Sequence, residues 1–309
     1  MLGLLLVIGS GALVEPAVAQ QQLAREQAEA RERADAERRA PTGPSSEGIP
    51  VPKRSRVASL ASSERLEGEA SVQYRTLLER ARAQRALAPV DHPQRQRLVQ
   101  IARRLVPYTH RFSDRSDDWR WEVNLIGSSQ VNAFVMPGGK IVFFSGILDA
   151  LDLTDDEVAM VMGHEMAHAL LEHARERSGQ QTVAQGLTLG ASVLSQVLGY
   201  GDLGGMLVQG ASKVTLLGFS RGDETEADLV GMDIAARAGY DPRAAVSLWQ
   251  KMAAKSKGQP PQWASTHPSH STRITTLQQA QPKVIPLYER ARTARDTAAQ
   301  DSTAPRTSP

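Results

Sequence analysis

A helical segment near the middle of the sequence constrains the fold most strongly. Thr154 and Glu157 stand three positions apart, the spacing of a capping box at a helix N-terminus. The residues that follow, as far as about Arg177, place apolar side chains on one stripe, which is typical of a helix packed inside a domain. That stripe consists of Val158, Val161, Met162, Met166, Ala169 and Leu170. We therefore expect one buried helix from Thr154 to about Arg177.

This predicted helix carries two histidines and an acid. His164 and His168 are four residues apart, so their imidazoles share a helix face roughly 6 Å apart and can bind the same ion. Glu165 is placed to act as general base on a water molecule at that ion. The chain has no cysteine, so His, Asp or Glu must supply every ligand. Two imidazoles and a carboxylate favour one zinc ion per chain.

A later acidic segment offers the third ligand. Glu224 and Asp228 are four residues apart on a second predicted helix, Asp223 to Ala238, and they share one face of it. We expect Glu224 to bind the metal and Asp228 to fix the tautomer of a ligating histidine by accepting its hydrogen bond. Glu226 is interpreted as a solvated charge. Four other histidines have no partner at a useful spacing and are interpreted as surface residues: His92, His110, His173 and His270.

The sequence between Trp119 and Phe144 changes to strand periodicity. Apolar residues alternate from Trp121 to Leu125, and apolar runs at 131–135 and 140–144 flank a Pro-Gly-Gly turn. Three short strands are therefore expected in a chain whose other patterns are helical, which predicts a mainly helical α+β fold. Further helices are predicted within residues 60–106 and at 242–254 and 269–281. Segment 182–219, rich in glycine and apolar residues, is interpreted as two helices closing the core, with a mobile cover or membrane-touching loop as the alternative.

The N-terminal segment indicates export. An apolar run from Leu2 to Val14 precedes Ala17 and Ala19, the small residues of a signal peptidase site, although no Lys or Arg precedes the run. We expect a periplasmic protein, with an internal start or an uncleaved anchor as alternatives. The predicted organisation is a signal peptide at 1–19, a charged helix and Pro-rich linker at 20–59, a catalytic domain at 60–290 and a disordered tail at 291–309.

Four motifs, in this order, resemble the gluzincin peptidase family M48, which contains the HtpX, BepA, LoiP and mitochondrial Oma-type zinc metallopeptidases. They are 132–139 (NAFVMPGG), 164–168 (HEMAH), 220–228 (SRGDETEAD) and 265–268 (STHP) with Arg273. The resemblance implies a zincin-like fold, with the small sheet beside the active-site helix. It also implies a zinc endopeptidase with His164, His168 and Glu224 as ligands and Glu165 as base.

The resemblance assigns further roles. Asn132 and Ala133 would lie on a strand that pairs with a polypeptide substrate in extended form. His267 would stabilise the oxyanion or fill the fourth zinc position until substrate displaces it, and otherwise it is a helix-entry residue. Arg273 would brace the site or pair with a carboxylate, with a purely structural role as the alternative.

The resemblance also suggests a biological setting, namely cell-envelope quality control of exported proteins that are misfolded or membrane-associated. A net charge of only +2 gives no reason to expect nucleic acid. Nine arginines between Arg80 and Arg115 indicate a solvated helix face, or else a docking patch for anionic lipid or a partner. A membrane surface or an outer-membrane assembly partner is a further expectation. Two rivals stay open. One is a latent or non-catalytic zinc-binding chaperone-like module, and the other is a membrane-attached regulator that keeps its leader.

Overall fold

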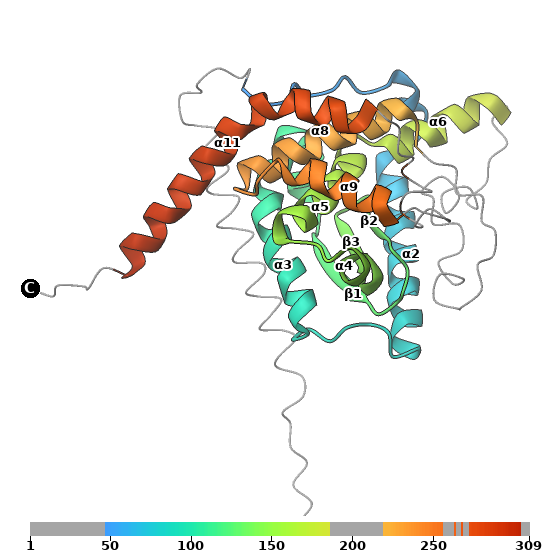
Figure 1. Ribbon diagram of the computed structural model, residues 1–309. Helices are drawn as coiled ribbons and strands as arrows, with labels where there is room; N and C mark the ends of the chain where they lie inside the picture. Colours follow the sequence, from blue (N-terminus) through green and yellow to red (C-terminus); the bar gives the residue numbers. More distant parts are fainter. Residues whose placement is uncertain (1–46, 186–218, 256–262, 264–266, 268–271, 304–309) are drawn as a thin grey trace, which may run out of the picture. The chain divides into compact units, whose positions relative to one another are not determined.

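A computed structural model describes residues 47–185, 219–255, 263, 267 and 272–303 (Figure 1). Helices predominate and one small sheet is present, so the mainly helical α+β prediction is confirmed. The elements in chain order are the 3-10 helix η1 (Arg56–Leu60), α2 (Ser63–Ala83), α3 (Pro93–Leu105), η2 (Val106–Arg111), η3 (Asp114–Asp118), β1 (Glu122–Ile126), β2 (Ala133–Met136), β3 (Lys140–Phe144), α4 (Ser145–Leu151), α5 (Asp155–Leu170), α6 (His173–Gln185), α8 (Arg221–Arg237), α9 (Ala244–Lys255) and α11 (Thr272–Thr303).

The sheet has the order β1-β3-β2, with β1 parallel and β2 antiparallel to the central strand β3. Both of its faces are covered by helices. Figure 1 shows α2 on one side of the sheet and α3 on the other. The face toward α2 carries Ile126, Phe134, Met136, Val142 and Phe144, and the face toward the main core carries Leu125, Ala133, Val135, Ile141 and Phe143. Burial on both faces explains why residues 133–136 of β2 and residues 141–144 of β3 are each an uninterrupted apolar run.

Helix α5 begins as predicted and ends early. Thr154 Oγ1 accepts a hydrogen bond from the Glu157 amide at 3.3 Å, and Glu157 Oε2 accepts one from the Thr154 amide at 2.9 Å, which completes the capping box. The helix stops at Leu170, because Glu172 takes the left-handed conformation with φ 59°. A separate helix, α6, then starts at His173. The prediction of one helix to about Arg177 is therefore wrong.

Three side chains hold the break at Glu172, and two of them come from distant parts of the chain. The buried carboxylate of Glu172 accepts hydrogen bonds from Ser63 Oγ at 2.8 Å, Arg175 Nη1 at 2.9 Å and Arg54 Nη1 at 3.3 Å. A left-handed residue costs roughly 1–2 kcal/mol, and charge-assisted hydrogen bonds of this kind offset that cost. Because Ser63 and Arg54 are remote in sequence, the local pattern around the helix does not contain this information.

Helix α8 packs along α5 through a glycine on each helix. A Cβ atom built at Gly163 would lie 2.7 Å from the Gly231 carbonyl oxygen, and one built at Gly231 would lie 2.5 Å from the His164 amide nitrogen. Any side chain at either position would therefore push the helices apart. This contact brings the N-terminal half of α8 against the histidines of α5.

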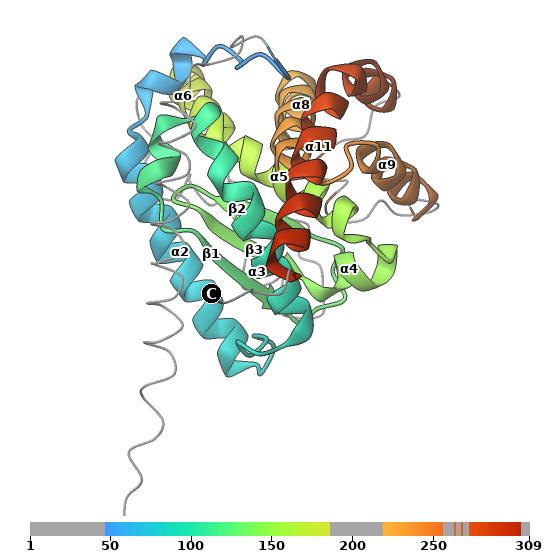
Figure 2. The same ribbon diagram turned by 90° about the vertical axis from the view of Figure 1, so that its left-hand side faces the viewer.

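The C-terminal helix α11 is longer than predicted. It continues through Pro282 and Pro286 to Thr303, so the predicted end at residue 281 is wrong. Four buried apolar side chains at helical spacing hold it against the core and outweigh the cost of the two prolines: Leu277, Ala280, Val284 and Leu287. Figure 2 shows α8, α9 and α11 gathered on the side away from α2. Residues 291–303, which we expected in a disordered tail, lie in this helix.

Several sequence predictions fall outside the described residues. They include the leader, most of the linker, residues 186–218 of the glycine-rich segment, and His270. The division of the chain into leader, linker, domain and tail therefore stays a prediction. Among the helices of the described ranges, none combines the length and the apolar character needed to cross a membrane.

The glycine contact between α5 and α8 predicts a strongly position-dependent effect of added methyl groups. We expect Gly231→Ala to lower the free energy of unfolding by about 1–3 kcal/mol, because the methyl group overpacks a closed interface. Gly68 of α2 is the control, since no atom lies within 4 Å of a Cβ built there. Gly68→Ala should be neutral or stabilising by up to about 1 kcal/mol. Equal effects of the two variants in chemical denaturation would contradict the close contact.

Candidate metal centre

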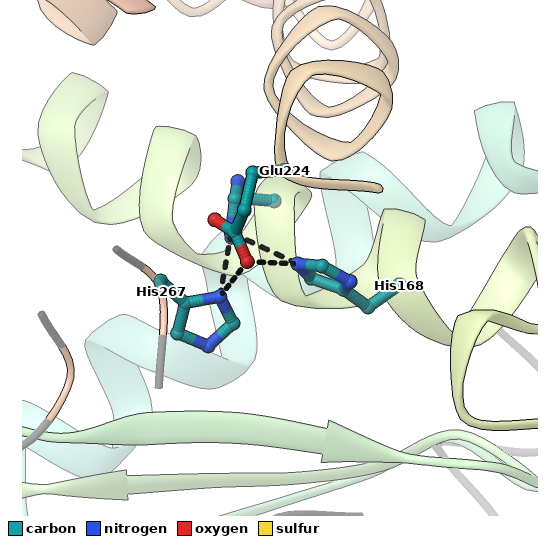
Figure 3. A group of neighbouring side chains, drawn as sticks. His168, Glu224 and His267 are labelled. Atoms are coloured by element: carbon teal, nitrogen blue, oxygen red, sulfur yellow. Dashed lines mark hydrogen bonds and ion pairs between the residues drawn. The ribbon is translucent and has the colours of Figure 1, made fainter. Parts of the chain in front are cut away.

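Four ligand-type side chains meet in the interior of the protein. His164 and His168 come from α5, Glu224 from the first turn of α8, and His267 from the segment before α11. Each residue is at most 4% exposed, and their ligand atoms all lie within 4.8 Å of one another. Figure 3 shows the Glu224 carboxylate between the rings of His168 and His267. The sequence prediction that His164, His168 and Glu224 lie together agrees with this geometry.

The donor atoms are close enough to share one ion. The Nε2 atoms of His164 and His168 are 3.1 Å apart, and each lies 3.6 Å from an oxygen of Glu224. His267 Nδ1 lies 3.0 Å from Glu224 Oε1 and 3.1 Å from His164 Nε2. Imidazole nitrogens and a carboxylate oxygen, without sulfur, are a donor set that suits zinc. The residues present therefore fit the metal expected from the sequence.

A buried ion-pair network supports one side of the cluster. Asp228 Oδ1 lies 3.0 Å from His164 Nδ1, so the other nitrogen of that ring, Nε2, is directed at the ligand group. Arg273 donates to both oxygens of Asp228, from Nε at 2.7 Å and from Nη2 at 2.6 Å. Its Nη1 donates to Glu224 Oε2 at 2.7 Å, and its guanidinium lies 3.7 Å from the centre of the Trp249 ring. One arginine thus fixes both acidic groups.

The electrostatic environment favours the neutral form of His168 and the ionised forms of Glu224 and Asp228, which are the forms that metal binding requires. Burial lowers the pKa of His168 well below its ordinary value, and the neighbouring His164 lowers it further. Burial alone would raise the pKa of Glu224, but His267, His164 and Arg273 outweigh it and lower the pKa. For Asp228, Arg273 and His164 likewise overcome the effect of burial and lower the pKa to about 2. A neutral imidazole therefore faces ionised carboxylates.

Glu165 lies beside the cluster, and two other residues contact its carboxylate. Trp263 Nε1 donates a hydrogen bond to Glu165 Oε1 at 2.6 Å, and His267 Nε2 lies 3.3 Å from the same oxygen. Burial would lower the pKa of His267, but the carboxylates of Glu165 and Glu224 outweigh it and raise the pKa. The acid predicted to serve as base is therefore next to the ligand atoms and is hydrogen-bonded in the interior.

Comparison with known proteins gives the same family as the motifs. Residues 93–281, more than half of the chain, match the sequence model of the family described as Peptidase family M48. The chain belongs to peptidase family M48. The resemblance inferred from the four motifs is thereby confirmed. The donor set described above suits zinc, the metal used by metallopeptidases of this family.

Individual relatives are similar over part of their length. Mitochondrial metalloendopeptidase OMA1 of Saccharomyces cerevisiae is 31% identical over 220 residues, which are 67% of this chain and 62% of the relative. Mitochondrial metalloendopeptidase OMA1 of Arabidopsis thaliana is 37% identical over 59% of this chain and 36% of the relative. Beta-barrel assembly-enhancing protease of Escherichia coli is 28% identical over 53% of this chain and 35% of the relative. The M48 chain thus spans less than two thirds of each of these relatives.

A pocket opens beside the candidate base in this M48 chain. Its lining includes Glu165 and His168 of α5 together with Val135, Pro137 and Phe219. Val135 belongs to β2, an outer strand of the sheet that pairs with β3, and β2 packs against α5. The sheet therefore lies beside the candidate active-site helix, as the family resemblance implied.

The two residues predicted to bind substrate lie at the start of β2. Asn132 and Ala133 are both buried, and the Asn132 side chain accepts a hydrogen bond from the Ala133 amide at 3.0 Å. The Asn132 carbonyl accepts one from Phe144 at 3.1 Å, which fastens this end of β2 to β3. Ala133 is thus the first residue of β2 and Asn132 directly precedes the strand, while their contact with substrate stays a prediction.

Three residues near the cluster were not identified from the sequence. His173 is 2% exposed and lies 2.9 Å from His168 through the Nδ1 atoms of both rings, so its prediction as a surface residue is wrong. Phe219 stacks on His168 with ring centroids 4.0 Å apart. Trp263 contacts Glu165, and its position four residues before His267 is the only local signal that could have indicated this. The side chain of Glu226 is 45% exposed, in line with the prediction for that residue.

The buried network around Arg273 predicts a large loss of stability when its charge is removed. We expect Arg273→Met to lower the free energy of unfolding by about 3–5 kcal/mol, because the buried charges of Asp228 and Glu224 would lose the arginine that pairs with both. Arg290→Met on the same helix is the control. Its ion pair with Glu47 is exposed and should contribute no more than about 1 kcal/mol. Similar losses in chemical denaturation would contradict the bracing role of Arg273.

Proposed function

We propose that this M48 chain is a zinc-dependent endopeptidase that hydrolyses internal peptide bonds of polypeptides. The observation that supports this most strongly is the buried cluster of His164, His168 and Glu224 with Glu165 beside it. In the proposal these three residues hold one zinc ion and Glu165 is the general base. The names of the yeast and Arabidopsis relatives, metalloendopeptidases, agree with this activity.

A bound zinc ion would supply Lewis acidity, which polarises a peptide carbonyl and makes a nearby water molecule more acidic. Glu165 then takes a proton from the attacking water and delivers it to the leaving amine. Trp263 donates a hydrogen bond to Oε1 of Glu165, and His267 lies near the same oxygen. Both residues therefore orient the carboxylate for this transfer. No covalent intermediate with the protein is needed.

The outer strand β2 is proposed to hold the substrate in an extended conformation, with Asn132 and Ala133 at its beginning. Support comes from its position against α5 and from the pocket that reaches from Val135 and Pro137 to Glu165. A substrate strand along β2 would carry one of its side chains into that pocket. His267 is proposed to stabilise the oxyanion, or to occupy the fourth zinc position until substrate arrives, because its Nδ1 is already among the ligand atoms.

We further propose that the substrates are exported proteins, misfolded or associated with a membrane, and that the chain acts in quality control of the cell envelope. One supporting observation is the signal-like sequence at 1–19. Another is the relative from Escherichia coli, whose name connects it with β-barrel assembly. An outer-membrane assembly partner is part of the same proposal.

Glu165→Gln tests the catalytic assignment. The variant should keep one zinc ion per chain, because the ligands are intact, and should lose about 10²–10⁴-fold in the rate of cleavage of casein or an unfolded outer-membrane protein. Glu176→Gln on α6 is the control. It should keep the parental rate, since the Glu176 carboxylate accepts a hydrogen bond from Gln180 of the same helix and is not one of the cluster residues. Parental activity in a zinc-loaded Glu165→Gln protein would show that Glu165 is not the base.

The rival proposal is a latent or non-catalytic zinc-binding module, favoured by the position of His267 within the ligand group. The same assay on His267→Ala separates the possibilities. A latent peptidase gains activity when this residue is removed, and an enzyme that uses His267 for the oxyanion loses it. A chaperone-like module would hold zinc and show no cleavage in either the parent or the variant.

The export proposal predicts a defined N-terminus for the mature protein. Cleavage after Ala19 would leave Gln20 as the first residue. Mass spectrometry of protein purified from its native membrane and soluble fractions measures this directly. A mature chain that retains residues 1–19 in the membrane fraction would support the membrane-attached alternative instead.

A further inference from the structure

His168 contacts a second buried histidine, His173, which in turn lies near the carboxylate of Glu226. Its Nδ1 lies 2.9 Å from Nδ1 of His173, and the two ring centroids are 4.9 Å apart. The far nitrogen of His173, Nε2, is buried and has no hydrogen bond among the described residues. An oxygen of Glu226 lies 3.5 Å from it, which is an ion-pair distance rather than a hydrogen bond. Spacing in the sequence assigns no function to His173 or Glu226.

The positions of the protons follow from this geometry. His168 Nε2 belongs to the ligand group and must present a lone pair, so the hydrogen of that ring is on Nδ1. That hydrogen can be donated only to an unprotonated Nδ1 of His173. The hydrogen of His173 is then on Nε2, the atom that faces Glu226. This set of tautomers gives the Nδ1 hydrogen of His168 an acceptor and turns the Nε2 hydrogen of His173 toward the Glu226 carboxylate.

We propose that His173 and Glu226 are positioning residues for the metal centre. His173 accepts the hydrogen bond that fixes the tautomer and ring orientation of His168, and Glu226 makes His173 a better acceptor by attracting its Nε2 hydrogen. This inference rests on the proposed function, because it concerns how a zinc ligand is held. It gives His168 a support that corresponds to Asp228 and Arg273 behind His164.

The break in the helix makes this contact possible. In a continuous α-helix His173 would lie five residues beyond His168 and about 140° around the axis, facing away from it. Glu172 in the left-handed conformation ends α5 and turns the chain, so the two rings meet. Phe219 stacks on the same histidine, and His168 is therefore held by a hydrogen bond at its edge and an aromatic ring on its face.

Zinc affinity, measured by competition with a chelator, tests the inference. His173→Leu should weaken zinc binding about 10–100-fold, because it leaves the Nδ1 hydrogen of His168 buried without an acceptor. His173→Asn should restore most of the lost affinity, since its amide oxygen can accept that hydrogen. Glu226→Gln should give a smaller loss, and Glu176→Gln should bind zinc like the parent. The visible spectrum of the cobalt(II) protein should change in His173→Leu and stay unchanged in Glu176→Gln.

Parental zinc affinity in His173→Leu would overturn the inference. Equal losses of zinc affinity in His173→Leu and His173→Asn, with equal destabilisation of the two metal-free proteins, would also overturn it. That pattern would indicate an effect of packing alone. Glu226→Gln, at a partly exposed position, serves as the test where the Leu variant does not fold, and parental affinity in it would remove Glu226 from the proposal. A parent protein that binds no zinc would overturn the proposed function, which separates that failure from this one.

Discussion

The close approach of Gly163 and Gly231 is the contact on which the metal centre depends. Gly163 directly precedes His164, so a helix that touches this glycine also touches the first histidine of the cluster. Asp228 and Glu224 precede Gly231 by three and seven residues, which on a helix places both on the side that faces α5. The spacing between α5 and α8 therefore sets whether the carboxylates reach the imidazoles. A methyl group at either glycine would act on ligand geometry as well as on packing.

The interior of the site contains charges that are expensive to bury and are therefore paired. Arg273 neutralises Asp228 and also contacts Glu224, while the Trp249 ring covers its guanidinium. Such a network adds little net stability compared with apolar packing, since desolvation offsets most of the attraction. It does hold each donor in one orientation before a metal binds. His168 is held by neutral groups instead, and its support ends at a partly exposed carboxylate. Charged groups therefore position His164, whereas neutral groups position His168 of the same motif.

Local sequence patterns predicted most of what is local in this structure. The capping box at Thr154, the three strands and the helical face shared by Glu224 and Asp228 all follow from spacing, and all are present. The end of α5 did not follow, because two of the side chains that contact the Glu172 carboxylate, Arg54 and Ser63, lie more than a hundred positions away. His173 was missed for the same reason, since helical spacing turns it away from His168 unless the helix breaks. The extension of α11 past its prolines likewise depends on tertiary packing.

The ligand set is the central claim, and anomalous X-ray scattering at the zinc edge from zinc-loaded crystals measures it directly. We predict one peak per chain in the described region, about 2.0–2.2 Å from Nε2 of His164, from Nε2 of His168 and from a carboxylate oxygen of Glu224. A peak bound by other residues, or a peak at the two histidines with Glu224 turned away from it, would contradict the proposed centre.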